Sequence, residues 1–103
     1  MRGYLLMRLE SNFQKTLIKE IKSLFPNCLV TKQDKKQGLP DLLIIYYDKW
    51  AMLECKRSKN EARQPNQEYY IDKFNSWSYA SFIYPENKEQ VLNELYRSFK
   101  NRR

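Results

Sequence analysis

The sequence predicts a single α/β domain in which helices flank a mixed sheet. Its 103 residues are enough for one hydrophobic core but not for two. The hydrophobic share of 42% and the aromatic share of 15% favour a folded chain despite the high charge. Helical and strand periodicities alternate along the chain in the order helix, three strands, helix, strand, helix. We therefore expect one domain over residues 1–103.

The first helix is expected from about Leu9 to Phe25, with Ser11 and Gln14 as a capping box if it begins later. Its lysines lie opposite its apolar residues. Glu10 falls near the middle of the apolar face, where a carboxylate is costly unless a cation or donor meets it. The apolar positions are Phe13, Leu17, Ile18, Ile21, Leu24 and Phe25, and the lysines are Lys15, Lys19 and Lys22.

Three strands are expected after this helix. A short one covers Cys28 to Lys32, and a polar turn then leads to Pro40, which suits the first residue of a strand. The β-rich segments 41–47 and 50–56 have equal lengths and two residues between them, which predicts a hairpin. The expected register pairs Tyr47 with Trp50, Leu43 with Glu54 and Asp41 with Lys56.

This register brings two carboxylates close together at the open end of the hairpin. Asp41 and Glu54 would be diagonal neighbours on one face, with Cα atoms roughly 7 to 8 Å apart. A bound cation can bridge carboxylates at that distance. A three-residue turn would place them on opposite faces, so the site depends on the length of the turn.

The rest of the chain alternates again. A linker-like stretch, 58–65, precedes a helix from about Pro65 to Tyr79 that buries Gln67, Tyr70, Ile71, Phe74 and Trp77 on one face. A strand over 81–84 follows, and Pro85 begins a last helix before a solvated tail, 100–103. The last helix has its apolar positions at Val91, Leu92, Leu95, Tyr96 and Phe99.

Composition narrows the class of protein. No segment approaches the roughly 20 apolar residues of a membrane span, and the start lacks a signal peptide, so we expect a cytoplasmic protein without a membrane partner. Two unclustered cysteines and no histidine argue against zinc and for reduced thiols. The formal charge of +7 favours a polyanionic partner, and nucleic acid is the partner we expect.

Several residues together resemble a known family. They are Glu10 on the first helix, Gly38 with Pro40 and Asp41, Glu54-x-Lys56, and Gln67 on the following helix. This set resembles the PD-(D/E)XK nuclease superfamily, and the Gly-x-Pro-Asp-Leu phrase with a downstream glutamine is most similar to its VRR-NUC branch. The resemblance spans about 10–84 and implies a restriction-endonuclease-like α-β-β-β-α-β core, here with an extra C-terminal helix.

The resemblance also implies an activity. Holliday-junction-resolving nucleases share this core, and stand-alone VRR-NUC domains of this size resemble phage proteins that act as homodimers on branched DNA. The function implied is a Mg²⁺- or Mn²⁺-dependent DNA endonuclease that selects Holliday junctions or other branched DNA. Two other readings remain: a basic nucleic-acid-binding module without catalysis, and a small sequence-specific restriction-type endonuclease.

The implied roles agree with the chemistry of the side chains. Asp41, Glu54 and the backbone carbonyl of Cys55 would hold the metal, because hard cations choose oxygen ligands. Glu10 would bind the metal through a water or hold a second ion. Lys56 would orient the attacking water or contact the phosphate, and Gln67 would position Lys56 or the nucleophile.

Other contacts are expected outside this centre. Arg57, Lys59 and Arg63 follow it on a loop where a phosphate backbone would pass. Lys15 and Lys19 are an exposed face that is as readily solvated as bound to DNA. The segment 4–7 offers apolar surface for a dimer interface, since symmetric cleavage of a junction requires two subunits.

Overall fold

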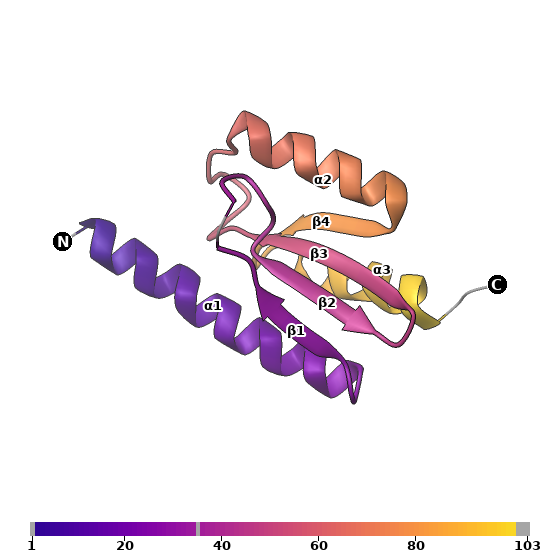
Figure 1. Ribbon diagram of the computed structural model, residues 1–103. Coiled ribbons are helices and arrows are strands. Elements are labelled where there is room, and N and C mark those ends of the chain that lie inside the picture. Colours follow the sequence, from indigo (N-terminus) through magenta and orange to yellow (C-terminus); the bar gives the residue numbers. More distant parts are fainter. Residues whose placement is uncertain (1, 35, 101–103) are drawn as a thin grey trace.

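The computed structural model contains a four-stranded sheet with helices on both faces (Figure 1). It describes residues 2–34 and 36–100, with side chains from residue 11 onward. The coarse prediction of an α/β fold with a mixed sheet is confirmed. The elements are α1 (Arg2–Leu24), β1 (Leu29–Lys32), β2 (Leu42–Tyr46), β3 (Lys49–Cys55), α2 (Pro65–Trp77), β4 (Tyr79–Ile83) and α3 (Lys88–Lys100).

The sheet has the strand order β1-β2-β3-β4. The first three strands pair antiparallel, and β4 joins the edge parallel to β3. A parallel neighbour requires a crossover, and α2 provides it. Figure 1 shows α2 on one side of the sheet and α1 on the other. No helix in 2–34 or 36–100 has the length and hydropathy needed to cross a membrane.

Each face of the sheet has its own apolar cluster, because alternate residues of a strand point to opposite faces. The larger cluster joins α1 and α3 to the sheet through side chains such as Leu17, Leu53 and Leu95, which are fully buried. The smaller cluster lies under α2 and consists of Met52, Ile71, Ala80 and Phe82. The α2 face is therefore covered less completely than the other.

The start of the first helix differs from the prediction. α1 begins at Arg2 rather than near Leu9, so Ser11 lies inside the helix and does not cap it. The reason is that 4–10 contains good helix formers and no proline. The predicted dimer segment, 4–7, is thus part of α1, and its side chains lie outside the described part. At the other end Asn27 takes a left-handed φ of 76° beside Pro26, which stops the helix as predicted.

The boundaries near the C-terminus also move. α2 ends at Trp77, where the backbone amide of Ser78 donates to the Phe74 carbonyl at 2.9 Å. β4 therefore covers 79–83 instead of 81–84. α3 begins at Lys88 rather than Pro85, because the Asn87 side chain accepts from the Tyr84 amide at 2.8 Å and holds 84–87 as a turn. Of the predicted tail, 100–103, Lys100 belongs to α3 instead, and 101–103 lie outside the described residues.

The predicted hairpin register is wrong by two residues. Tyr46 pairs with Lys49, Ile45 with Trp50 and Leu42 with Leu53. The turn is still two residues long, but Tyr47 belongs to it, with a φ of 59° that two-residue hairpin turns require. A shift of two residues keeps every side chain on its predicted face.

One residue of the predicted buried face of α2 is exposed. Trp77 has 63% of its surface accessible, whereas Ile71 is buried and Tyr70 and Phe74 are half-buried. The cause is the position of α2, which packs on β3 and β4. Residues on the side of the helix toward β2 therefore have less sheet beneath them.

Candidate active site

A tight loop before β2 places Asp41. Gly38 has a φ of 93°, and a Cβ built on it would lie 2.6 Å from the side-chain nitrogen of Asn66. Only glycine tolerates both the conformation and the close approach. The loop therefore packs directly on the first turn of α2. It continues through Pro40, which is buried, into Asp41.

Asp41 is fixed between two strands. Its backbone carbonyl accepts from the amide of Gln33 at 2.7 Å. Its carboxylate Oδ2 accepts from the backbone amide of Cys55, at the end of β3, at 3.0 Å. The pair Leu42 and Leu53, continued by one step, places Asp41 directly opposite Glu54 and not opposite Lys56 as predicted. The two carboxylates share the α2 face of the sheet.

The surroundings of Asp41 disfavour its negative charge. Burial raises the pKa of Asp41, while the hydrogen bond from the Cys55 amide and the charge of Lys56 pull it down without offsetting the rise. The carboxylate of Glu61 adds to the rise. A bound cation at this position would relieve the cost of the charge.

Glu54, Lys56 and Gln67 form one hydrogen-bonded group. Glu54 and Lys56 are two residues apart, so they lie on the same face of β3 and its extension. Their exposed fractions are only 4% and 5%. The Lys56 ammonium donates to Gln67 Oε1 at 2.8 Å, and Gln67 Nε2 donates to Glu54 Oε2 at 3.0 Å. The sequence-predicted carboxylate, lysine and glutamine are therefore brought together.

The orientation of the Gln67 amide follows from these partners. Its oxygen also accepts from the backbone amide of Gln64, at 3.0 Å, just before α2. An amide oxygen can only accept and an amide nitrogen can only donate. With the oxygen occupied by Lys56 and Gln64, the nitrogen must face Glu54. The first turn of α2 thus sets the distance between the acidic and basic groups of the site.

The stretch 58–65, predicted to be linker-like, is held to the site by hydrogen bonds and ion pairs made by it and by the preceding Arg57. The Arg57 amide donates to Glu61 Oε1 at 2.6 Å, and Lys56 donates to the carbonyl of Ala62 at 3.2 Å. Glu61 Oε2 lies 4.0 Å from the Lys56 ammonium and 3.8 Å from the Arg57 guanidinium. These contacts fold the segment back over the site.

Sequence reasoning missed Glu61 altogether. Its signal was present, because Glu61 is the only acidic residue between Glu54 and Glu68 in a segment rich in basic residues. A lone carboxylate in such a segment is expected to pair with a neighbouring cation. Its place beside Lys56 and Asp41 makes it part of the electrostatics of the site.

The remaining predicted residues are distributed over the molecule. Glu10 belongs to α1, two turns before the buried Leu17, and its side chain lies outside the described part. Lys15 and Lys19 are exposed on α1, which covers the other face of the sheet from α2. Arg57 and Lys59 remain beside the site, half-buried and exposed respectively. The α1 lysines thus belong to a different layer from the site.

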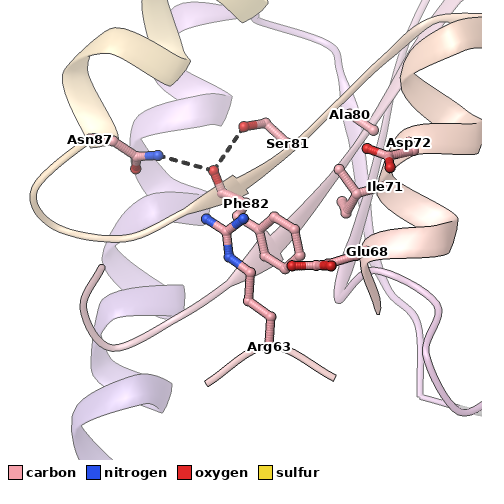
Figure 2. A pocket seen from close by; sticks show the side chains of 8 residues that line it. All are labelled: Arg63, Glu68, Ile71, Asp72, Ala80, Ser81, Phe82 and Asn87. Atoms are coloured by element: carbon pink, nitrogen blue, oxygen red, sulfur yellow. Dashed lines mark hydrogen bonds between the residues drawn. The ribbon is translucent and has the colours of Figure 1, made fainter. Parts of the chain in front are cut away.

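Arg63 contributes to a pocket beside the site. Its guanidinium carbon lies 4.0 Å from the centre of the Phe82 ring, and Phe82 is the β4 neighbour of Glu54. Figure 2 shows this stacked pair at one wall of the pocket, with Asn87 and Ser81 turned toward the Phe82 carbonyl. The pocket has a volume of about 400 Å³ and is also lined by Glu68, Ile71, Asp72 and Ala80.

The oxygen atoms at the site suit a hard divalent cation. Asp41 and Glu54 face each other at the ends of paired strands, and Mg²⁺ is usually held by one or two carboxylates with several waters. Among the side chains described, no group of three or more acidic, cysteine or histidine residues is placed to hold a metal. A cation held here would thus rest on two carboxylates and backbone oxygen, and the donor set fits it.

Comparisons of the chain with protein-family models, with curated proteins and with solved structures find no match. The geometry of Asp41, Glu54, Lys56 and Gln67 is therefore the basis for a function. Two neighbouring carboxylates, one of them joined through an amide to an ammonium group, can hold a cation and a water next to a phosphate.

Proposed function

We propose that this chain is a Mg²⁺- or Mn²⁺-dependent endonuclease that hydrolyses phosphodiester bonds in DNA. The observation that carries the proposal is the continuous link from Glu54 through Gln67 to Lys56, with Asp41 opposite Glu54. A buried lysine tied to a buried carboxylate through an amide is an expensive arrangement for stability alone. The residues also agree with the resemblance to the VRR-NUC branch of PD-(D/E)XK nucleases and its restriction-endonuclease-like core.

The proposed roles divide between holding the cation and acting on the phosphate. Asp41, Glu54 and the carbonyl of Cys55 hold the metal, and Glu10 joins them through a water or a second ion. When bound, the cation lowers the pKa of a water ligand and neutralises charge on the phosphate. Lys56 orients the attacking water or contacts the scissile phosphate. Gln67 fixes the ammonium group relative to Glu54.

The proposed substrate is branched DNA, such as a Holliday junction, cut by a homodimer in the cytoplasm. Phosphates contact Arg57, Lys59 and Arg63, which surround the site on the folded loop. Two subunits about a two-fold axis would cut two strands symmetrically. A phage origin agrees with the resemblance to stand-alone phage domains, and the protein would then act in the host cytoplasm.

The proposal is tested by a cleavage panel with Mn²⁺ on a four-way junction, a flap, a single strand and a duplex of identical sequence. We expect Lys56→Ala to lower the rate on the preferred substrate by about 10² or more, the effect of removing a group that stabilises transition-state charge. Lys59→Ala is the matched control, because Lys59 is exposed on the same loop, and it should reduce only binding.

Two outcomes would contradict the proposal. In the first, no substrate is cut and Mn²⁺ does not stabilise the fold, while DNA binding persists with a steep dependence on salt. That result would identify a binding module without catalysis. In the second, Lys56→Ala cuts as fast as the wild type, which would remove the assigned site. Cleavage at one fixed sequence in linear duplex would instead support the restriction-type alternative.

A further inference from the structure

α2 carries a row of aromatic side chains, here called the α2 aromatic row, whose middle members are half-buried against the sheet. The ring centres of successive members lie 5.1 to 5.7 Å apart. Trp50 of β3 joins the row through Phe74, with ring centres 6.0 Å apart. The members on α2 are Tyr69, Tyr70, Phe74 and Trp77.

The row is exposed at both ends. Tyr69 has 56% of its surface accessible and Trp77 has 63%. They lie eight residues apart, which is about 12 Å along the helix axis. Large exposed aromatic side chains in one contiguous surface mark an interaction site in a soluble domain. The exposed ends of the row therefore indicate a binding surface rather than only the edge of the core.

A positive charge lies within this aromatic surface. The Lys73 ammonium is 5.3 Å from the centre of the Tyr69 ring and 5.4 Å from that of Trp77, and it donates to the Tyr69 hydroxyl at 3.1 Å. Alternating aromatic faces and an ammonium group are complementary to unstacked bases and the phosphates between them. They are less suited to an apolar protein partner, which would have to desolvate Lys73.

The row is also continuous with the candidate site. Tyr70 follows Gln67 by three residues, so these two side chains lie on the same side of α2. The part of the sheet face beside the row is open over β1 and β2, where Leu29 is 55% exposed, and Asp41 immediately precedes β2 on that face. A strand with a phosphate at the carboxylates could extend its bases over this region.

We propose that the α2 aromatic row binds the unpaired bases of a DNA strand whose backbone passes the candidate active site. This inference rests on the proposed nuclease function and gives it a substrate class: DNA with a single-stranded or unstacked segment, rather than continuous duplex. Trp77 and Tyr69 stack on bases, and Lys73 contacts the phosphate between them. The stacked bases are held on the helix that also carries Gln67.

The test uses binding without cleavage, so that it does not depend on catalysis. In buffer with EDTA, single-stranded oligothymidylate and a blunt duplex of equal length are titrated into the Trp50→Phe variant. Because the chain has two tryptophans, this variant leaves Trp77 as its only tryptophan. We expect the single strand to quench Trp77 fluorescence and the duplex to leave it unchanged.

Affinities of variants give the second readout. Trp77→Ala should weaken single-strand binding about tenfold, in the range measured for the loss of one base–aromatic stack, and leave duplex binding unchanged. Trp77→Phe should restore most of the affinity. Tyr96→Ala is the matched control, because Tyr96 is an exposed aromatic residue of α3. Lys73→Gln should reduce the slope of log K against log salt by about one.

Defined outcomes would overturn the inference. Equal weakening of single-strand and duplex binding by Trp77→Ala would do so, as would an unchanged single-strand affinity. A Trp77→Ala variant that sediments as a smaller species with unchanged affinity would identify the row as a subunit interface instead. Failure of the nuclease proposal would appear separately, as absence of cleavage with quenching intact.

Discussion

At the scale of single residues, Gln67 is the most informative side chain. Its amide joins the Glu54 carboxylate to the Lys56 ammonium and fixes the start of α2 through Gln64. The bond to Glu54 depends on the amide nitrogen as a donor, which an ionised carboxylate at this position would lack. The identity of residue 67 should therefore matter more than its size.

Gln67→Glu would place a second carboxylate against Glu54 in a buried site. We expect the variant to lose about 1 to 3 kcal/mol of stability, the cost of leaving a buried polar group without its partner. Thermal unfolding by circular dichroism would measure this. The matched control is Gln90→Glu, since Gln90 donates to Glu94 at 3.1 Å on the exposed side of α3. An equal loss in both variants would contradict the assigned role.

Asp41→Asn tests the cost of the charge at the site. Because burial raises the pKa of Asp41, the folded state favours the protonated form. This contribution to stability is present below the ordinary pKa of an aspartate and is lost as the pH rises through the raised pKa of the folded state. In EDTA, Asp41→Asn should therefore melt higher than the wild type at pH 7, and the gain should shrink toward pH 4.

Addition of Mg²⁺ and a control variant test whether the effect is specific to the carboxylate of Asp41. Mg²⁺ should raise the melting temperature of the wild type and leave that of Asp41→Asn almost unchanged, because only the wild type keeps both carboxylates. Asp34→Asn, which removes an exposed carboxylate, should show neither effect. A lower melting temperature of Asp41→Asn at pH 7 without metal would contradict the electrostatic account.

At the scale of elements, the site depends on how a loop, a hairpin and a helix meet. Side-chain parity in the hairpin was predictable, because a two-residue turn keeps Asp41 and Glu54 on one face whichever residues form it. The register was not predictable, since Tyr47 is a strand former by type and takes a left-handed turn conformation only within the folded hairpin. The contacts of Glu61 and the exposure of Trp77 depend on how segments distant in sequence pack, which periodicity does not encode.

The contact between Gly38 and α2 gives a prediction at this scale. Gly38→Ala combines a positive φ with a Cβ 2.6 Å from Asn66, so we expect a loss of about 1 to 3 kcal/mol in urea unfolding. Gly3→Ala is the control, because Gly3 lies in the first turn of α1, where alanine adopts the helical conformation without strain, so its stability should change by less than about 1 kcal/mol.

A second variant separates the two causes. Asn66→Ala removes the atom nearest to the added Cβ, so it should recover part of the loss in a Gly38→Ala background and leave the part caused by φ. A Gly38→Ala protein as stable as the wild type would show that the loop moves freely over α2.

At the scale of the whole molecule, the two faces of the sheet differ in what they carry. The face under α1 and α3 holds the larger core, whereas the face under α2 holds the candidate site and the α2 aromatic row. Among the side chains described, from residue 11 onward, the first buried one of α1 is Leu17, and the helix itself begins at Arg2. Figure 1 shows the N-terminal part of α1 extending beyond the sheet. If the proposed homodimer forms, we expect this part of α1, which includes the predicted dimer segment 4–7, to contact the other subunit.

Removal of residues 1–6 tests this arrangement. If the proposed homodimer uses the start of α1, a chain that begins at Met7 should sediment as a monomer and keep its melting temperature, because it retains the buried core residues of α1 from Leu17 onward. Sedimentation velocity of the two chains at equal concentration would decide. A truncated chain that still forms the same dimer would place the interface elsewhere.

The contact of Gly38 with Asn66 has a consequence for engineering. Lengthening the turn before Asp41, or adding a side chain to it, would lift a metal-binding carboxylate away from the helix that positions Gln67. New substrate preferences are therefore better introduced at 58–60, where Lys59 and Asn60 are exposed. Insertions there would leave the contact between Gly38 and Asn66 intact. Directed evolution of this chain should accumulate changes there and conserve the glycine.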